Sequence, residues 1–151
     1  MAPFPAAVAA YGKPGGGDWA GGIIATPIVH DGFIYSVTEG GLLIVYDLKA
    51  KQEAYRKQLE ARTRFAYVSR PGFVSSPSIA GKYLYLMDDY CTTFIVELGP
   101  KYKLVGKNDL QDLNPNWNDT VNQQATMSTP IFDENRMYVR TSSGFWCIGD
   151  K

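Results

Sequence analysis

A threefold internal repeat constrains the fold of this 151-residue chain more than any other feature of its sequence. Each copy opens with Ser or Thr followed by proline, and a tyrosine stands eight residues after that proline. Six residues after the tyrosine comes a turn residue. A strand residue follows three positions after the turn residue, and an acidic residue three positions after that. The landmarks are Pro27, Tyr35, Gly41, Ile44 and Asp47 in the first copy, Pro77, Tyr85, Cys91, Phe94 and Glu97 in the second, and Pro130, Tyr138, Gly144, Cys147 and Asp150 in the third. The prolines are 50 and then 53 residues apart, and such periods are typical of solenoids, propellers or arrays.

The repeated segments have the composition of β-strands. The runs Ile34–Val37, Leu84–Met87 and Met137–Arg140 are rich in β-branched and aromatic residues and lie between turn-forming residues. Gly32 and Gly81 belong to hairpin turns, because glycine adopts positive φ at little cost. The proline that opens each copy cannot donate to a sheet, so it is expected at a strand edge or at a first residue.

Further arms at Glu53–Leu59 and Tyr102–Lys107 follow the first two copies. Counting the apolar run before each proline as the first strand gives four strands per unit. The sequence therefore predicts an all-β fold, a β-propeller of four-stranded antiparallel blades with three blades in this chain. The expected organisation is a Pro/Gly-rich leader at 1–22, then blades at about 23–59, 73–107 and 126–151, the third lacking an outer strand.

The repeat resembles the pyrroloquinoline-quinone-like β-propeller family, also known as the quinoprotein alcohol dehydrogenase-like propeller, over residues 23–151. The best copy runs from Thr26 to Tyr55, and it departs from the family pattern after Asp47. The family has a Thr-Gly-Lys turn and a docking Trp there, whereas Tyr55 stands at the Trp position in this chain. The resemblance implies a propeller and a periplasmic or secreted location. It implies no quinone, since many members bind none, and we expect no cofactor.

Charge and hydropathy exclude several classes of partner. Lys plus Arg and Asp plus Glu both number 15, so no basic excess favours nucleic acid or an anionic membrane. No apolar run approaches the length of a membrane-spanning helix. Residues 1–10 lack the basic region that opens a signal peptide. We therefore predict no nucleic-acid partner and no membrane span.

Ligand contacts are predicted on the rim of the propeller, in the segments outside the repeats. Trp19 stands in the glycine-rich leader, and Trp117 in the long polar stretch 108–125. Arg62 and Arg64 lie in the linker 60–72 among aromatic residues, a mixture that suits anionic ligands. The alternative for the arginines is salt bridging to neighbouring blades, and the alternative for Trp19 is a plain entry loop.

No catalytic or metal-binding residue is predicted. Asp112, Asn114, Asn116 and Asn118 alternate like calcium-loop ligands, but Trp117 and Gln123 stand where that loop needs Gly and Glu. His30 belongs to a hairpin turn without a motif-placed Ser or Cys partner. Cys91 and Cys147 occupy different places in different copies. We expect free thiols there, a turn thiol at Cys91 and a buried strand thiol at Cys147, and no disulfide.

Three blades form an open arc, whereas propellers close with about four to eight. We therefore expect a non-catalytic scaffold for binding or assembly, completed by dimerisation or by the blades of a longer parent chain. Phe4 to Tyr11 is predicted to supply the outer strand that the third blade lacks, and in a two-copy ring this strand would come from the partner chain. One alternative is a fragment of a quinone-dependent dehydrogenase. The other is a carbohydrate-binding or carbohydrate-processing propeller that uses Trp19, Trp117 and the arginines of the linker 60–72.

Overall fold

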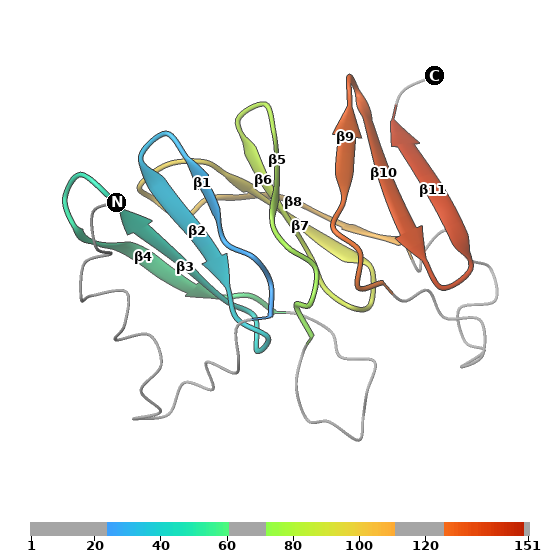
Figure 1. Ribbon diagram of the computed structural model, residues 1–151, viewed down its shortest axis with the longest axis horizontal. Coiled ribbons are helices and arrows are strands. Elements are labelled where there is room, and N and C mark those ends of the chain that lie inside the picture. Colours follow the sequence, from blue (N-terminus) through green and yellow to red (C-terminus); the bar gives the residue numbers. More distant parts are fainter. Residues whose placement is uncertain (1–23, 61–71, 111–125, 150–151) are drawn as a thin grey trace.

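The computed structural model describes residues 24–60, 72–110 and 126–149. Within these ranges eleven strands form three antiparallel sheets, two of four strands and one of three, which stand side by side in chain order (Figure 1). The prediction of an all-β fold built from propeller blades is confirmed. The proposed closing strand, Phe4 to Tyr11, lies outside the described residues.

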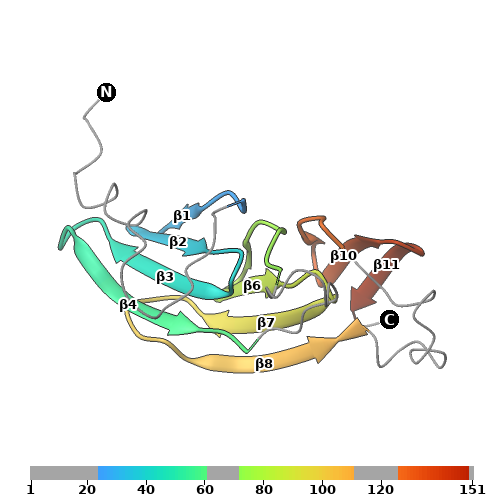
Figure 2. The same ribbon diagram turned by 90° about the horizontal axis from the view of Figure 1, so that it is seen from below.

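Each sheet is a blade whose neighbouring strands are neighbours in the chain. Blade 1 contains β1 (Ile28–His30), β2 (Phe33–Val37), β3 (Leu42–Asp47) and β4 (Gln52–Gln58). Blade 2 contains β5 (Ser78–Ala80), β6 (Tyr83–Met87), β7 (Thr92–Glu97) and β8 (Leu104–Asp109). The described part of blade 3 contains β9 (Ile131–Asp133), β10 (Arg136–Thr141) and β11 (Gly144–Gly149). Figure 2 shows the short strand β1 on one edge of the arc and the long strands β4 and β8 on the opposite edge.

The first strand of each blade follows the proline, so the prediction that it precedes the proline was wrong. Ile24 and Phe73 lie outside any strand, and β1 begins at Ile28. The two-residue turn Asp31-Gly32, with φ of 46° and 81°, closes β1 onto β2 immediately afterwards. The proline has no N–H for a sheet ladder, and the residue before it bonds to the next blade instead, as shown below.

The turn between the second and third strands is built alike in blades 1 and 2. Thr38 and Asp88 cap it with side-chain oxygens that accept the N–H groups of Leu42 (3.1 Å) and Thr92 (2.8 Å). Gly41 and Cys91 both hold a left-handed backbone there, with φ of 83° and 61°. The sequence repeat had aligned these two residues, and the structure confirms that alignment.

Two apolar cores lie between adjacent blades. The larger, between blades 1 and 2, buries Tyr35, Val37, Leu43 and Val45 of blade 1 against Leu84, Leu86, Phe94 and Val96 of blade 2. The smaller, between blades 2 and 3, contains Met87, Cys91, Leu110, Met137 and Val139. Each blade therefore buries its side chains against its neighbours, and alternate residues of a strand point to opposite neighbours.

The register of blade 3 differs from the sequence prediction by one residue. Leu86 pairs with Phe94 across blade 2, but the equivalent Val139 pairs with Trp146 and not with Cys147. The cause is a turn of only two residues between Thr141 and Gly144, which are themselves a ladder pair. A one-residue slip moves each side chain to the other face of a sheet. Cys147 is therefore exposed, while the turn thiol Cys91 is fully buried, the reverse of the prediction.

Candidate functional site

The four residues predicted from sequence as ligand contacts, Trp19, Arg62, Arg64 and Trp117, lie outside the described residues. The carbohydrate interpretation depends on both tryptophans and on the arginines of the linker, and it stays a prediction. Two surfaces of the described part of the chain carry the features of a functional site. One is the free face of blade 3, and the other is a groove between the outer strands of blades 1 and 2.

A chain of hydrogen bonds, here called the inter-blade relay, links the residue before the proline of each blade. The N–H of Thr26 donates to Ser76 Oγ at 2.9 Å, and the N–H of Ser76 donates to Thr129 Oγ1 at 3.1 Å. Ser76 therefore accepts from one neighbour and donates to the other. The signal for these residues was present in the sequence as the repeated Ser/Thr-Pro pair, which had been interpreted only as a strand boundary.

The relay ends at Thr129. This residue is exposed, and among the described residues its N–H has no acceptor. Ser78 adds a second link between blades 2 and 3 by donating from Oγ to the carbonyl oxygen of Pro130. The residue before the proline of blade 3 is thus placed as in blades 1 and 2. Among the described residues, the Thr129 N–H has no following blade to donate to.

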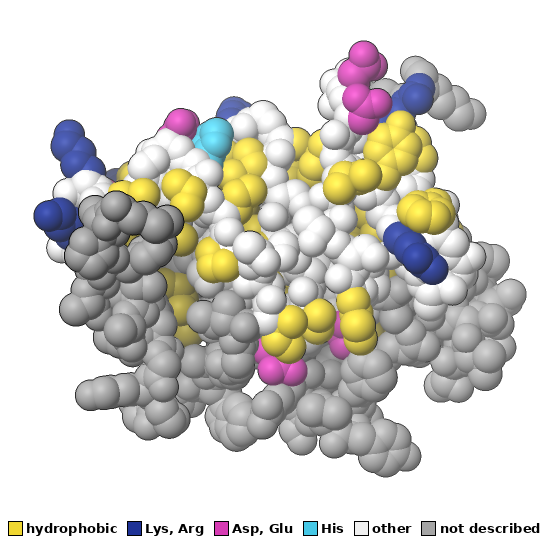
Figure 3. All heavy atoms as spheres, viewed as in Figure 1, with side chains coloured by type: hydrophobic (Ala, Val, Ile, Leu, Met, Phe, Trp, Pro, Cys, Tyr) yellow, Lys and Arg dark blue, Asp and Glu magenta, His cyan; other side chains and the backbone are white. Residues whose placement is uncertain are grey.

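The free face of blade 3 is defined by the side chains that point away from blade 2: Ile131, Tyr138, Arg140, Phe145 and Cys147. Ile131 is 64% exposed and Phe145 81% exposed, and the Arg140 guanidinium lies 5.8 Å from the Phe145 ring centre. Figure 3 shows hydrophobic side chains beside a basic one over this part of the molecule.

The corresponding faces of blades 1 and 2 are covered. Tyr35, the equivalent of Tyr138 in blade 1, is 1% exposed, and its hydroxyl accepts the N–H of Gly99 of blade 2 at 2.9 Å. Tyr85, its equivalent in blade 2, packs against Phe132 of blade 3 with ring centres 4.5 Å apart. The tyrosine at this repeat position therefore contacts the next blade in both blade 1 and blade 2. In blade 3 the equivalent Tyr138 faces no further blade among the described residues.

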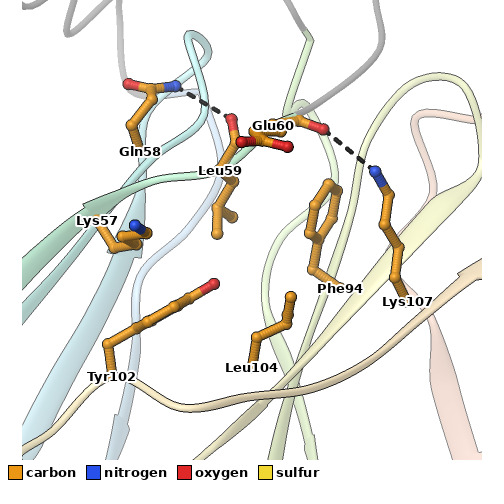
Figure 4. Close-up of a pocket in the computed structure, with 8 residues that line it drawn as sticks. All are labelled: Lys57, Gln58, Leu59, Glu60, Phe94, Tyr102, Leu104 and Lys107. Carbon is orange, nitrogen blue, oxygen red and sulfur yellow. Dashed lines mark hydrogen bonds between the residues drawn. The ribbon is translucent and has the colours of Figure 1, made fainter.

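The second surface is a groove of about 290 Å³ between blades 1 and 2, here called the rim groove (Figure 4). Leu59, Phe94, Tyr102 and Leu104 form its apolar part. Around them lie four polar or charged residues, Lys57, Gln58, Glu60 and Lys107. In Figure 4 the side chains of Leu59 and Leu104 point toward one another across the groove. No repeat position marks these residues, so the sequence pattern did not reveal this site.

Each lysine of the rim groove lies over an aromatic ring. Lys107 Nζ is 4.8 Å from the Phe94 ring centre and donates to the Glu60 carbonyl oxygen at 3.3 Å. Lys57 Nζ is 5.6 Å from the Tyr102 ring centre. Burial raises the pKa of the Tyr102 hydroxyl, and the charge of Glu60 adds to this effect. Tyr102 therefore stays protonated at physiological pH and can donate a hydrogen bond beside Lys57 Nζ.

The described residues contain no group of three His, Cys, Asp or Glu side chains placed to hold a metal ion. His30 lies 3.2 Å from Asp31 at an exposed hairpin turn. Asp88 is buried, and its carboxylate accepts the N–H groups of Tyr90 and Thr92, which is a turn-capping role. A search of the described ranges for a helix able to cross a membrane found none.

Comparison with solved structures identifies the fold. The quinohemoprotein alcohol dehydrogenase from Comamonas testosteroni superimposes with a TM-score of 0.62 at 11% identity, covering 82% of this chain and 18% of that one. BamB from Moraxella catarrhalis matches with a TM-score of 0.39 at 14% identity, covering 83% of this chain and 43% of BamB. This chain thus spans less than half the length of either protein. No protein-family model matches the sequence, and no curated protein matches it.

Proposed function

We propose that this chain, which has the blade fold of the pyrroloquinoline-quinone-type β-propellers, is a non-catalytic assembly module. Its three blades form an arc, and the free face of blade 3 receives a further blade of the same repeat. In the isolated chain that blade is blade 1 of a second copy, so that two copies form one ring. The observation that carries the proposal is the inter-blade relay, whose forward donor at Thr129 is available.

Repetition of the interface supports this function. Both blade junctions have the same two contacts. A hydroxyl group of the following blade accepts a backbone N–H of the preceding blade, and the following blade covers the tyrosine of the preceding one. The free face of blade 3 presents the donor half of that arrangement, Thr129 N–H, together with the half-buried Tyr138, which no further blade covers among the described residues. Blade 1 presents the acceptor half, because Thr26 is exposed and no described residue donates to its Oγ1. The two ends of the arc are therefore complementary.

The exposed apolar side chains agree with the same partner. Phe145 and Ile131 on blade 3 and Val29 on β1 are all more than half exposed. Burial of one such side chain contributes about 1.5–3 kcal/mol. Ile44 and Tyr46, on the same face of blade 1 as Val29, are already buried. We therefore expect the contact on blade 1 to be made mainly through its inner strand.

The test is the solution mass by light scattering, with variants of the free face. The parent chain should have twice its own mass of 16.7 kDa, and Phe145→Glu should give the monomer. Val105→Glu is the matched control, because Val105 on β8 is also exposed, at 48%, and lies in another blade. A parent chain that stays monomeric at high concentration, or dimers that persist in Phe145→Glu, would contradict the proposal.

A further inference from the structure

The rim groove is a separate surface from the free face of blade 3, and nothing in the assembly function requires it. It lies between the outer strands of blades 1 and 2. One wall is formed by β4 and the two residues that follow it, Leu59 and Glu60, and the other wall includes β8 (Figure 4). The apolar contacts of the blade 1–blade 2 core end there, at Leu59 and Phe94, which are both buried. Leu104, on the opposite wall, is 44% exposed.

The volume of the groove limits its occupant. Pockets for drug-sized ligands or cofactors measure about 300–1,000 Å³, and the rim groove, at about 290 Å³, is at the lower limit. It is open rather than enclosed, because Leu104 and both lysines are exposed at its edge. These features suit one large apolar side chain of an extended peptide better than a whole cofactor.

The charges of the groove select what flanks that side chain. Its lining carries two ammonium groups, Lys57 and Lys107, and one carboxylate, Glu60. Lys107 Nζ bonds to the carbonyl oxygen of Glu60, an uncharged acceptor, so its positive charge is not neutralised by that contact. The head group of each lysine lies over an aromatic ring at the edge of the groove, Lys57 over Tyr102 and Lys107 over Phe94. Acidic residues of a bound peptide would meet these head groups.

We propose that the rim groove binds an extended acidic peptide, with an apolar side chain seated between Leu59 and Leu104 and its flanking carboxylates bonded to Lys57 and Lys107. Charge complementarity and the exposed edge of the groove together favour this occupant. The outer edges of β4 and β8 have no strand partner among the described residues, so the approach along the rim is open to an extended chain.

The experiment uses the full chain and a fluorescein-labelled peptide, Gly-Ser-Asp-Leu-Leu-Asp-Ser-Gly, with fluorescence anisotropy as the readout. Lys57→Gln and Lys107→Gln should each weaken binding by about threefold, as expected for exposed ion pairs. Leu104→Asp should weaken it by about tenfold, because it places a carboxylate in the apolar part of the groove. The peptide with Asn in place of Asp should bind more weakly than the acidic peptide.

Two variants serve as matched controls. Lys101→Gln removes an exposed positive charge outside the groove, and Val105→Asp changes the half-exposed neighbour of Leu104 that does not line it. Both should bind the peptide as the parent does. Equal binding by Leu104→Asp and Val105→Asp would overturn the proposal. Equal binding of the Asp and Asn peptides would also overturn it. So would an unchanged anisotropy at a protein concentration of about 1 mM, which is high enough to detect weak binding.

Discussion

The backbone N–H of Ser76 donates to Thr129 Oγ1 at 3.1 Å, while Ser76 Oγ accepts from the N–H of Thr26 at 2.9 Å. One residue therefore joins three blades, through its side chain to blade 1 and through its backbone to blade 3. Both bonds involve the residue before the opening proline of a blade, where the backbone is extended and its N–H is not used by the sheet. The blades are joined at their inner strands by this polar relay and farther out by the two apolar cores.

Removal of the hydroxyl at Ser76 should lower stability. Ser76→Ala takes the acceptor from the Thr26 N–H, and the loss of one such hydrogen bond costs about 0.5–1.5 kcal/mol. Urea unfolding followed by fluorescence measures the change. Ser76→Thr keeps a hydroxyl and should stay near the parent. A Ser76→Ala variant as stable as the parent would argue against the relay.

Two tyrosines near the junction of blades 1 and 2 should respond oppositely to loss of their hydroxyl. Tyr35→Phe leaves the Gly99 N–H without its acceptor and should destabilise the fold by about 1 kcal/mol. The Tyr55 hydroxyl is buried with no hydrogen-bond partner among the described residues, so Tyr55→Phe should be neutral or stabilising. Thermal unfolding of both variants distinguishes them, and a larger loss in Tyr55→Phe than in Tyr35→Phe would contradict the assignment.

Stability should fall at alkaline pH. Burial raises the pKa of the hydroxyls of Tyr35, Tyr55, Tyr85 and Tyr102 above their ordinary value. A raised pKa in the folded chain means that these groups stabilise the fold fully below about pH 10, the ordinary value, and that this contribution is lost as the pH rises toward the folded-state values.

Urea unfolding at a series of pH values tests this. Tyrosine ionisation should leave the free energy of unfolding unchanged between about pH 7 and 9 and should lower it above about pH 10. Tyr55→Phe should decline less steeply, because burial raises the pKa of Tyr55 furthest. A parent protein with no loss of stability in strong alkali would show that these hydroxyls ionise freely in the folded chain.

The two cysteines should differ in reactivity. Cys147 is exposed on the free face of blade 3, and Cys91 is 0% exposed in the core between blades 2 and 3. A thiol reagent should therefore modify one group in the folded Phe145→Glu monomer and both groups after denaturation. Peptide mapping should place the first modification at Cys147. Failure of Cys147 to react would contradict the register found in blade 3, and rapid reaction of Cys91 would contradict its burial between blades 2 and 3.

The sequence repeat predicted the blades because its landmarks are positions with physical requirements. Proline excludes a ladder donor, Gly41 needs a left-handed backbone, and Tyr35 fills the space between blades. A Cβ added at Gly41 would lie 3.1 Å from the Phe73 ring. The arm predicted at Glu53–Leu59 is β4, shifted by one residue, and the arm predicted at Tyr102–Lys107 is β8, shifted by two.

The register of blade 3 could not be predicted from the same landmarks. Counting residues from Tyr138 to Cys147 takes no account of how many of them the turn uses. Trp146 Nε1 donates to Thr141 Oγ1 at 3.0 Å across the short turn. The spacing of the repeat landmarks does not predict this contact. The rim groove was missed for a related reason. Its residues come from the divergence of two blades, where packing and not the repeat decides which side chains meet.

The relay gives the arc a direction. Its donor is always the backbone of one blade and its acceptor is always the hydroxyl of the next, so the bonds run one way from Thr26 to Thr129. An arc with a head and a tail associates head to tail and not face to face. Such contacts close into a ring when the curvature of the arc allows it, and otherwise they continue without limit as a filament. The curvature set by the two apolar cores therefore decides between a finite particle and a fibre.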